Sequence, residues 1–147
     1  MFDIKDKNVL ITGATSGIGR AAALELSSLG ANIFFVARDD GKAQLLVDDI
    51  YEISKKAAIP IIADLSSQSD IRKAAETFNS LNLPLHVLLN NAGLINKERK
   101  KTIDGYEEVF AINHLAYFLL TNLLIGKLKE AMGSRIVNVS SGAHAFV

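Results

Sequence analysis

The sequence predicts an α/β fold in which a doubly wound parallel sheet carries helices on both faces. Short apolar runs rich in Val, Ile, Leu and Phe alternate with longer segments in which apolar residues recur at helical spacing. The runs are almost continuously apolar, which is typical of parallel strands that are covered on both sides. We expect strands at residues 8–12, 32–37, 59–63, 85–90 and 135–140, and helices at 17–29, about 40–56, about 68–80 and about 103–131.

Each element has its own signal along the chain. NVLIT at 8–12 leads into a helix with Ile18, Ala22, Leu26 and Leu29 on one stripe, and Gly30 stands where a C-terminal cap belongs. NIFFVA at 32–37 precedes the second helical segment. IPIIA at 59–63 is followed by SSQSD, which offers capping residues, and then by the stripe Ile71, Ala75, Phe78 and Leu81. LHVLLN at 85–90 and RIVNVS at 135–140 enclose the longest helical segment.

The order of the strands follows from the connections. Strands joined by helices pair in parallel through right-handed crossovers. Pro60 cannot donate a hydrogen bond to a neighbouring strand, so the third strand should lie at an edge of the sheet. The doubly wound order 3-2-1-4-5 places it there. We therefore predict this order in one domain covering residues 1–147.

Composition restricts the possible partners. The 16 basic and 16 acidic side chains balance, so no overall field indicates a nucleic acid or an anionic membrane as partner. The chain has no cysteine, which excludes disulfides and thiolate metal sites, and no residues show metal-ligand spacing. The first residues lack a signal-peptide pattern, and the apolar stretch 116–125 is too short for a bilayer span. We expect a cytoplasmic protein without a transmembrane segment or a bound metal.

The stretch TGATSGIG, residues 12–19, has the composition of a phosphate-binding loop. A helix that starts there presents unpaired N–H groups and a partial positive charge to an anion. Glycine permits a sharp turn and a close approach, and Thr12, Thr15 and Ser16 add hydroxyl groups. No Lys-Ser or Lys-Thr follows the last glycine, which excludes a P-loop. Taken alone, the stretch is equally compatible with a flexible turn that binds nothing.

Four further segments accompany this loop in a fixed order. They are Asp64-Leu65 after the third strand, NNAG at 90–93, Asn113 within FAINHLAYFLLT, and Ser140-Ser141 within RIVNVSSGAH. With TGxxxGIG, they make the chain resemble the classical short-chain dehydrogenase/reductase family over essentially its whole length, in wording most similar to its retinol-dehydrogenase-like branch. The resemblance implies a Rossmann-like fold and an oxidoreductase that transfers a hydride between a nicotinamide dinucleotide and an alcohol or carbonyl substrate.

The resemblance also implies roles for individual residues. The cofactor-binding set would be Gly13, Thr15, Ser16, Gly17, Ile18, Gly19, Arg38, Asp64, Leu65, Asn91, Ala92 and Gly93. Asp64 would accept from the adenine amino group, and Ser141 would hydrogen-bond the substrate carbonyl. Asn113 would hold a water and a lysine in a proton relay. The alternative for Asn113 is a buried, satisfied structural amide, on an apolar stripe that faces the sheet with Tyr106, Phe110, Tyr117, Leu120 and Leu124.

The end of the second strand favours NADP over NAD. A 2′-hydroxyl is recognised by a carboxylate, whereas a 2′-phosphate needs an arginine. The sequence there is VARDD, with Ala37 in the place of the family's usual acidic residue and Arg38 next to it. A guanidinium pairs with phosphate and stacks on adenine. Asp39 and Asp40 would repel a phosphate if they pointed inward, so NAD remains the alternative.

The resemblance breaks at the end of the chain. The family's Tyr-x-x-x-Lys motif would fall about a dozen residues after Ser141, beyond Val147, together with the C-terminal strands and helices. Tyr51 and Lys55 have the spacing but lie in the second helix, and we interpret this as coincidence; His144 is a weak substitute base. We expect little activity from this chain alone. A truncated or degenerate nucleotide-binding module without catalysis is the alternative, and homo-oligomers are possible. The NNAG and VSS segments argue against a methyltransferase.

Overall fold

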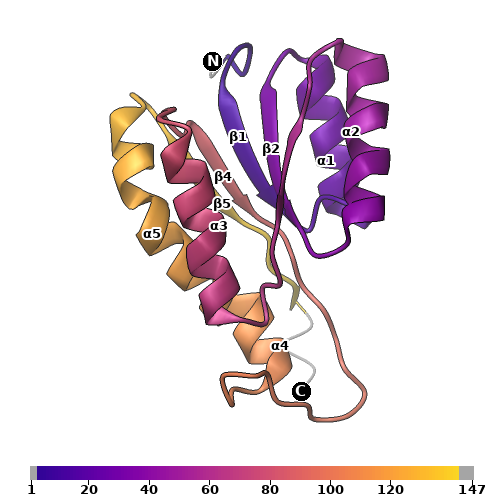
Figure 1. Cartoon of the computed structure of the whole chain (residues 1–147), viewed down its shortest axis with the longest axis vertical. Helices are drawn as coiled ribbons and strands as arrows, with labels where there is room; N and C mark the ends of the chain where they lie inside the picture. The colour runs from indigo at the N-terminus through magenta and orange to yellow at the C-terminus, as the bar shows by residue number, and fades with distance from the viewer. Residues whose placement is uncertain (1–2, 143–147) are drawn as a thin grey trace.

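The computed structural model describes residues 3–142 and shows a five-stranded parallel sheet (Figure 1). The strands are β1 (Asn8–Thr12), β2 (Asn32–Ala37), β3 (Ile59–Ile62), β4 (Val87–Asn90) and β5 (Arg135–Asn138). Their order is β3-β2-β1-β4-β5, and every pairing is parallel. The predicted fold class and strand order are confirmed. Pro60 lies on edge strand β3, opposite Phe35 of β2, as its missing N–H requires.

Helices cover both faces of the sheet. Helices α1 (Gly17–Ser28) and α2 (Asp40–Ser54) lie on one face, and α3 (Gln68–Ser80) and α5 (Ala116–Glu130) lie on the other. Because side chains alternate along a strand, Val9 and Ile11 of β1 pack towards α1 and α2, while Leu10 packs towards α3 and α5. This two-sided burial explains the apolar sequences of β1 and β2. The edge strands differ from the expectation: all four residues of β5 are exposed, and β3 buries only Ile61.

Capping differs among the helices. Helix α2 begins after Asp39, whose carboxylate accepts from the Lys42 N–H at 2.8 Å, and α3 begins after Ser67, whose hydroxyl accepts from the Asp70 N–H at 3.3 Å. The side chain of Ser16, in the cap position of α1, makes no capping hydrogen bond. The N-terminus of α1 thus leaves its N–H groups open, in contrast to those of α2 and α3.

The longest helix differs from the prediction. It begins at Glu108 rather than near residue 103, because Gly105 (φ +83°) lies in a turn and the Glu107 carboxylate caps the first helical N–H groups. Helix α4 (Glu108–Phe110) continues through a π-helical turn, Ala111–Leu115, into α5. Such a turn shifts the phase of the helix. The expected stripe is therefore wrong in part: Tyr106 precedes the helix, and Phe110 is exposed.

The continuous helical run from Glu108 to Glu130 has the length and composition of a membrane span. In this fold it forms one layer of the domain, since Leu120, Leu124 and Leu128 are buried in the cluster shared with α3 and the sheet. No other helix within residues 3–142 meets the same length and composition criteria.

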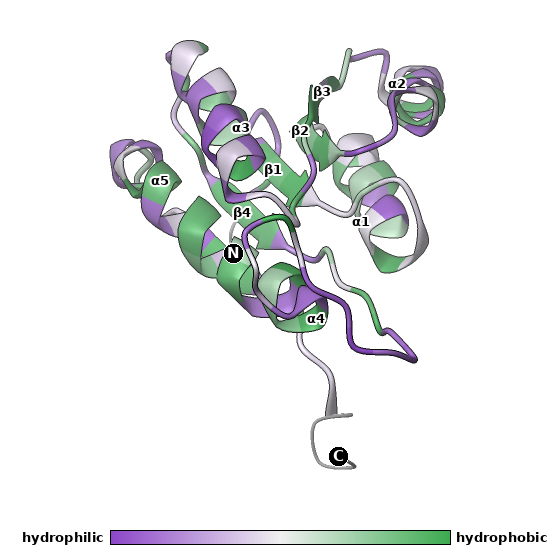
Figure 2. Cartoon of the chain, turned by 60° about the horizontal axis from the view of Figure 1, so that its bottom comes forward, coloured by the Kyte–Doolittle hydropathy of each residue, from purple (hydrophilic) through white to green (hydrophobic). Residues whose placement is uncertain are grey.

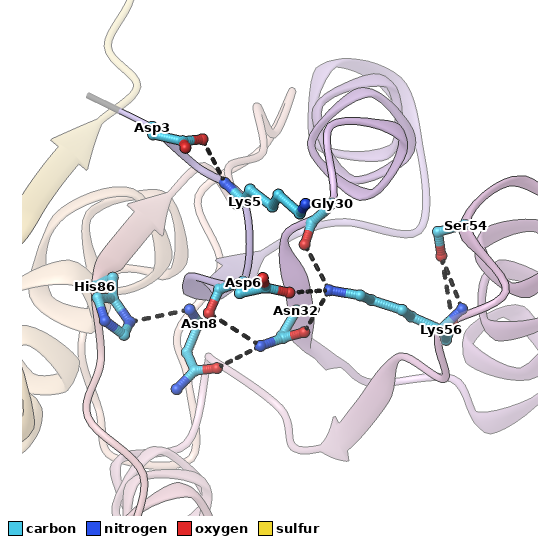
Figure 3. Close-up of polar contacts among 9 residues, drawn as sticks. All are labelled: Asp3, Lys5, Asp6, Asn8, Gly30, Asn32, Ser54, Lys56 and His86. Carbon is cyan, nitrogen blue, oxygen red and sulfur yellow. Dashed lines mark hydrogen bonds and ion pairs between the residues drawn. The ribbon is translucent and has the colours of Figure 1, made fainter. Parts of the chain in front are cut away.

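A polar network joins the N-terminal ends of the strands (Figure 3). The Lys56 ammonium donates to Asp6 Oδ1 and to the Gly30 carbonyl, both at 2.7 Å, and to Asn32 Oδ1 at 3.2 Å. The Asn32 amide in turn donates to Asn8 Oδ1 at 3.0 Å. These contacts hold the N-terminal ends of the strands together. The loops that follow the strands, where the functional site lies, are at the opposite end of the sheet.

Candidate functional site

A cavity of about 520 Å³ lies where the loops after β1, β2, β3 and β4 meet. The carboxyl ends of parallel strands are where open α/β sheets bind ligands. Eleven predicted cofactor-binding residues line this cavity: Gly13, Thr15, Ser16, Gly17, Ile18, Arg38, Asp64, Leu65, Asn91, Ala92 and Gly93. Val36, Ala37, Ala63, Leu94, Ile112 and Val139 also line it and were not predicted. They are apolar residues at or close to the ends of strands, apart from Ile112 in the long helix, whose place at the cavity no pattern in the sequence indicated.

The glycines of the first loop have three different roles. Gly13 has φ +67°, and a Cβ there would lie 2.7 Å from the Ala92 Cα. Gly17 has φ +53°, and a Cβ added there would have no atom within 4 Å, so its backbone faces open space at the cavity. Gly19 does not line the cavity; a Cβ there would overlap the Gly13 carbonyl oxygen and the Asn91 amide nitrogen. Gly19 therefore allows α1 to pack closely against the loop.

The N-terminus of α1 opens onto the cavity. Ser16, Gly17 and Ile18 line the cavity at the start of the helix, and no acidic residue lies in its first turn. The partial positive charge of the helix end is consequently not neutralised by the chain itself. Such an end stabilises an anionic group.

The end of β4 is attached to the loop after β1 through side chains. The Thr12 hydroxyl, which is 1% exposed, accepts from the N–H groups of Asn91 and Ala92 at 2.9 and 3.0 Å. The Asn91 amide donates to the carbonyls of Thr12 and Gly13 at 3.0 and 3.2 Å. Thr12 is thus committed to the backbone rather than to a phosphate, contrary to the expectation from its hydroxyl. Asn91 connects two loops that both face the cavity.

The floor of the cavity, residues 92–94, is held from the long helix. The Tyr117 hydroxyl donates to the Ala92 carbonyl at 2.8 Å, and burial raises the pKa of Tyr117. Asn113 Nδ2 donates to the Leu94 carbonyl, and Asn113 Oδ1 accepts from the Leu94 N–H, both at 2.9 Å. Asn113 is exposed, so it is not the buried amide of the alternative interpretation, although its amide is satisfied. Its part in a proton relay stays a prediction.

Arg38, directly after β2, places a positive charge at the cavity. Arg38 lines it and is exposed, and the neighbouring Ala37 is buried. Asp39 and Asp40 are not part of the lining. Asp39 is directed to the start of α2, where its carboxylate accepts from the Lys42 N–H. Asp39 is therefore held at the start of α2, and neither carboxylate lines the cavity beside Arg38.

Asp64 reaches the cavity from the loop after β3, two residues after Ile62, whereas the glycine loop follows β1. Its Oδ1 accepts from the Ser66 N–H at 2.8 Å, which orients the carboxylate. Leu65 next to it also lines the cavity. The pair provides one oriented acceptor and one apolar surface, which is the combination that an adenine ring needs.

Neither of the two predicted catalytic residues, Asn113 and Ser141, is part of the cavity lining, although Ile112, next to Asn113, is. Ser141 is exposed and lies two residues after Val139, the last residue of the lining. His144 lies outside the described residues. Tyr51 is on α2, away from the lining, with the Lys55 ammonium 5.6 Å from its ring centre, as expected for a coincidental spacing. Residues 3–142 contain no group of three or more His, Asp or Glu side chains arranged for a metal ion.

These features define a class of protein. A parallel sheet of order 3-2-1-4-5 with a glycine loop, an open helix N-terminus and a cavity at the strand ends is a dinucleotide-binding domain. The sequence narrows the class further. The family model of the short chain dehydrogenases matches residues 7–146, and the chain belongs to this family.

Curated relatives match nearly all of the chain. Bovine retinol dehydrogenase 12 is 43% identical over 139 residues, human retinol dehydrogenase 11 is 44% identical over 139 residues, and human polyprenol dehydrogenase is 40% identical over 144 residues. The matches cover 94–95% of this chain but 44% of each relative. The chain thus spans less than half of the length of these relatives.

Solved structures show the same fold. A short chain dehydrogenase from Escherichia coli CFT073, complexed with NADPH, has a TM-score of 0.86 at 27% identity and is covered over 62% of its length. One from Shigella flexneri, complexed with NADP, has a TM-score of 0.85 at 27% identity and is likewise covered over 62%. Each match covers 97% of this chain.

Proposed function

We propose that this chain forms the cofactor-binding part of an NADP(H)-dependent oxidoreductase that transfers a hydride between nicotinamide and an alcohol or carbonyl. The observation that carries the proposal is the cavity that brings together eleven of the predicted cofactor-binding residues from four loops. When bound, the nicotinamide supplies or accepts the hydride. The protein binds and orients the cofactor and polarises the substrate.

The residues of the cavity fit a dinucleotide. The open N-terminus of α1, with Gly17 and the Ile18 N–H, suits the pyrophosphate because no side chain caps it. The apolar wall at Val36 and Leu65 suits a flat ring, with Asp64 as the acceptor for its amino group. The floor at residues 92–94 would support the nicotinamide half.

Preference for NADP(H) rests on Arg38. It is the cation in the lining of the cavity, Ala37 leaves no carboxylate for a 2′-hydroxyl, and Asp39 is engaged at α2. The two solved relatives complexed with NADPH and NADP support the same preference. NAD binding is the alternative, and it would need a carboxylate where the chain has Ala37.

Two residues are proposed to act on the substrate side. The Ser141 hydroxyl would donate to the substrate oxygen and stabilise the charge that develops there. Asn113 would keep the floor in place through Leu94 and take part in proton transfer. Within residues 3–142 no tyrosine lines the cavity, so we assign the proton donor to none of them and expect the isolated chain to turn over little or no substrate.

The names of the relatives suggest a class of substrate. Their names specify retinol and polyprenol, so we propose a hydrophobic alcohol or its carbonyl as the substrate. We further propose that the protein acts in the cytoplasm, forms homo-oligomers and has no nucleic-acid partner. A non-catalytic nucleotide-binding module is the alternative, and it would bind the same cofactor in the same cavity.

Replacing Arg38 tests the cofactor preference. Arg38→Gln removes a charge-assisted contact, so the dissociation constant for NADPH should rise about tenfold or more, while that for NADH should barely change. Arg72→Gln, an exposed change on α3 outside the cavity, is the matched control. An equal loss for both dinucleotides, or no loss for either, would contradict NADP preference without contradicting dinucleotide binding. Multiple turnovers by the unmodified chain with NADPH and a carbonyl would contradict the expected lack of activity.

A further inference from the structure

The loop between β4 and α4 carries a local excess of positive charge that the balanced total conceals. Lys97, Arg99, Lys100 and Lys101 stand within five residues, and all four are exposed. The ion pairs of the described residues include none of them. We call residues 95–103 the basic loop. It runs along the lower end of the molecule in Figure 1, away from the N-terminal ends of the strands.

Nearby carboxylates accept hydrogen bonds within the protein, and Glu107 is also close enough to Arg99 for their charges to interact. Glu107 accepts from the Val109 and Phe110 N–H groups at 3.0 and 2.7 Å. Glu108 accepts from the Asn96 amide, and Asp104 accepts from the Gln68 N–H at 2.8 Å. Glu98 is the remaining acidic residue inside the run. Residues 95–103 themselves carry four cations and one carboxylate, so the loop keeps a net positive charge.

The C-terminal part of the basic loop is held by backbone hydrogen bonds. The Glu108 N–H donates to the Lys100 carbonyl at 3.0 Å, and the Thr102 N–H donates to the Tyr106 carbonyl at 2.8 Å. Lys101 and Glu107 also form an antiparallel bridge. A positioned row of cations loses less conformational entropy on binding a surface than a free tail would.

Two large apolar side chains flank the cations along the chain. Ile95 is 89% exposed and Ile103 is 88% exposed, more than any other isoleucine described. Figure 2 shows a hydrophobic stretch followed by a hydrophilic one in this loop. Exposed isoleucine side chains are not stabilised in water. Their transfer from water to the boundary between headgroups and acyl chains lowers the free energy.

From this arrangement we infer that the basic loop docks the protein on the surface of an anionic phospholipid bilayer. The cations contact the headgroups, and Ile95 and Ile103 enter the outer edge of the hydrocarbon. Polybasic segments are attracted to anionic leaflets, and apolar neighbours add insertion to that attraction. A nucleic acid would use the cations but would leave the isoleucines exposed, so the pairing of both favours lipid.

Docking would bring the cavity close to the membrane. Leu94 lines the cavity and precedes Ile95 directly. A hydrophobic alcohol dissolved in the bilayer would then have a short path to the cleft, a consequence that rests on the proposed function. The docking itself does not: it depends only on the charges and apolar side chains of the loop and is measured without turnover.

Vesicle flotation tests the docking. The full chain is mixed with phosphatidylcholine vesicles that contain phosphatidylserine, and separately with phosphatidylcholine vesicles alone. We expect binding to the first only, with a loss in high salt. A variant with Lys97, Arg99, Lys100 and Lys101 all changed to Gln should bind far more weakly, by about fivefold for each charge removed. Ile95→Ser with Ile103→Ser should weaken binding roughly tenfold.

Controls separate a local site from general charge. Changing Lys42, Arg72, Lys73 and Lys129 to Gln removes the same charge from exposed positions outside the loop and should leave vesicle binding nearly unchanged. Met132→Ser, at a residue that is 96% exposed, is the control for the isoleucines. Thermal melts by circular dichroism confirm that each variant is folded. Equal binding to both vesicle types, equal losses in the control variants, or binding to an oligonucleotide that is insensitive to the isoleucine changes would each overturn the inference.

Discussion

The side chain of Asn113 is hydrogen-bonded to the backbone of Leu94 at two points, with Nδ2 donating to the carbonyl and Oδ1 accepting from the N–H, each at 2.9 Å. Asn113 lies in the π-helical turn, and Tyr117 follows one turn later with its hydroxyl on the Ala92 carbonyl. The floor of the cavity is thereby tied to the long helix at both ends. A substitution in the helix that breaks either attachment should therefore change cofactor affinity.

Replacing Asn113 by alanine removes both hydrogen bonds to Leu94. We expect the free energy of unfolding to fall by about 1–2 kcal/mol, and NADPH binding to weaken because the floor is less well ordered. Urea denaturation and calorimetric titration measure the two effects. Asn122→Ala, which removes a bond from Nδ2 to the Phe118 carbonyl on an exposed part of the same helix, is the control. If Asn122→Ala weakened NADPH binding as much as Asn113→Ala, the floor would not be the route of the effect.

Tyr117→Phe tests the second attachment of the floor. The ring remains, but the Ala92 carbonyl loses its donor, so stability should decrease by about 1 kcal/mol and NADPH affinity should decrease with it. Tyr106→Phe changes a hydroxyl on an exposed residue outside the cavity lining and should alter neither quantity. Unchanged NADPH affinity in Tyr117→Phe would show that the floor does not depend on this bond.

Two glycine-to-alanine changes in helices should have opposite signs. Gly19→Ala places a methyl group into the Gly13 carbonyl and the Asn91 amide, and we expect a destabilisation of about 3 kcal/mol or more. Gly126, in α5, has no atom within 4 Å of the added methyl position, so Gly126→Ala should stabilise the protein by about 0.5–1 kcal/mol. Thermal melts of both variants decide this. A mild effect of Gly19→Ala would mean that α1 and the loop can separate at little cost.

Stability should fall in mild acid because of His86. Its Nδ1 accepts from the Asn8 N–H at 3.0 Å, and partial burial together with the Lys7 charge lowers the pKa of His86. Protonation is thus less favourable in the folded than in the unfolded state. The stabilising contribution is complete above the unfolded pKa, about 6.5, and is lost as the pH falls towards the lower folded value.

Urea denaturation between about pH 8 and pH 5 measures this dependence. The variant His86→Gln should show a flatter dependence over this range, whereas His114→Gln should follow the unmodified protein. His114 is exposed and stacks on Phe110, with 5.1 Å between ring centres. Identical pH profiles for His86→Gln and the unmodified protein would contradict the assignment.

The sequence determines the sheet more clearly than it determines the long helix. Apolar runs that alternate with helices indicated a doubly wound parallel sheet, and Pro60 agreed with the order 3-2-1-4-5 because its missing N–H suits an edge strand. The helix start at Glu108 depends on a turn at Gly105 and on a cap from Glu107, which periodicity does not reveal. The π-helical turn is likewise invisible to a count of apolar spacing.

The same distinction holds at the site. Gly13 and Gly17 were predicted from the resemblance of TGATSGIG to the family's loop, and the structure gives the physical reason, since both have a positive φ that favours glycine. The Thr12 hydroxyl was expected to be available to a phosphate. It instead accepts hydrogen bonds from two backbone N–H groups at the end of β4, and Asn91, one of these donors, is 79 residues away along the chain. The alternative interpretation of Asn113 as a buried amide does not hold, because Asn113 is exposed and contacts Leu94. Such long-range partners cannot be predicted from spacing along one segment.

Calorimetric titration of the unmodified chain with NADPH tests the central claim most directly. The cavity predicts saturable binding of one NADPH per chain, displaced by NADP⁺ and weakened when Gly17, at φ +53° beside the open end of α1, is changed to Val. NADH should bind more weakly under the same conditions. The absence of saturable binding by either dinucleotide to a chain shown to be folded would contradict a cofactor site in this cavity.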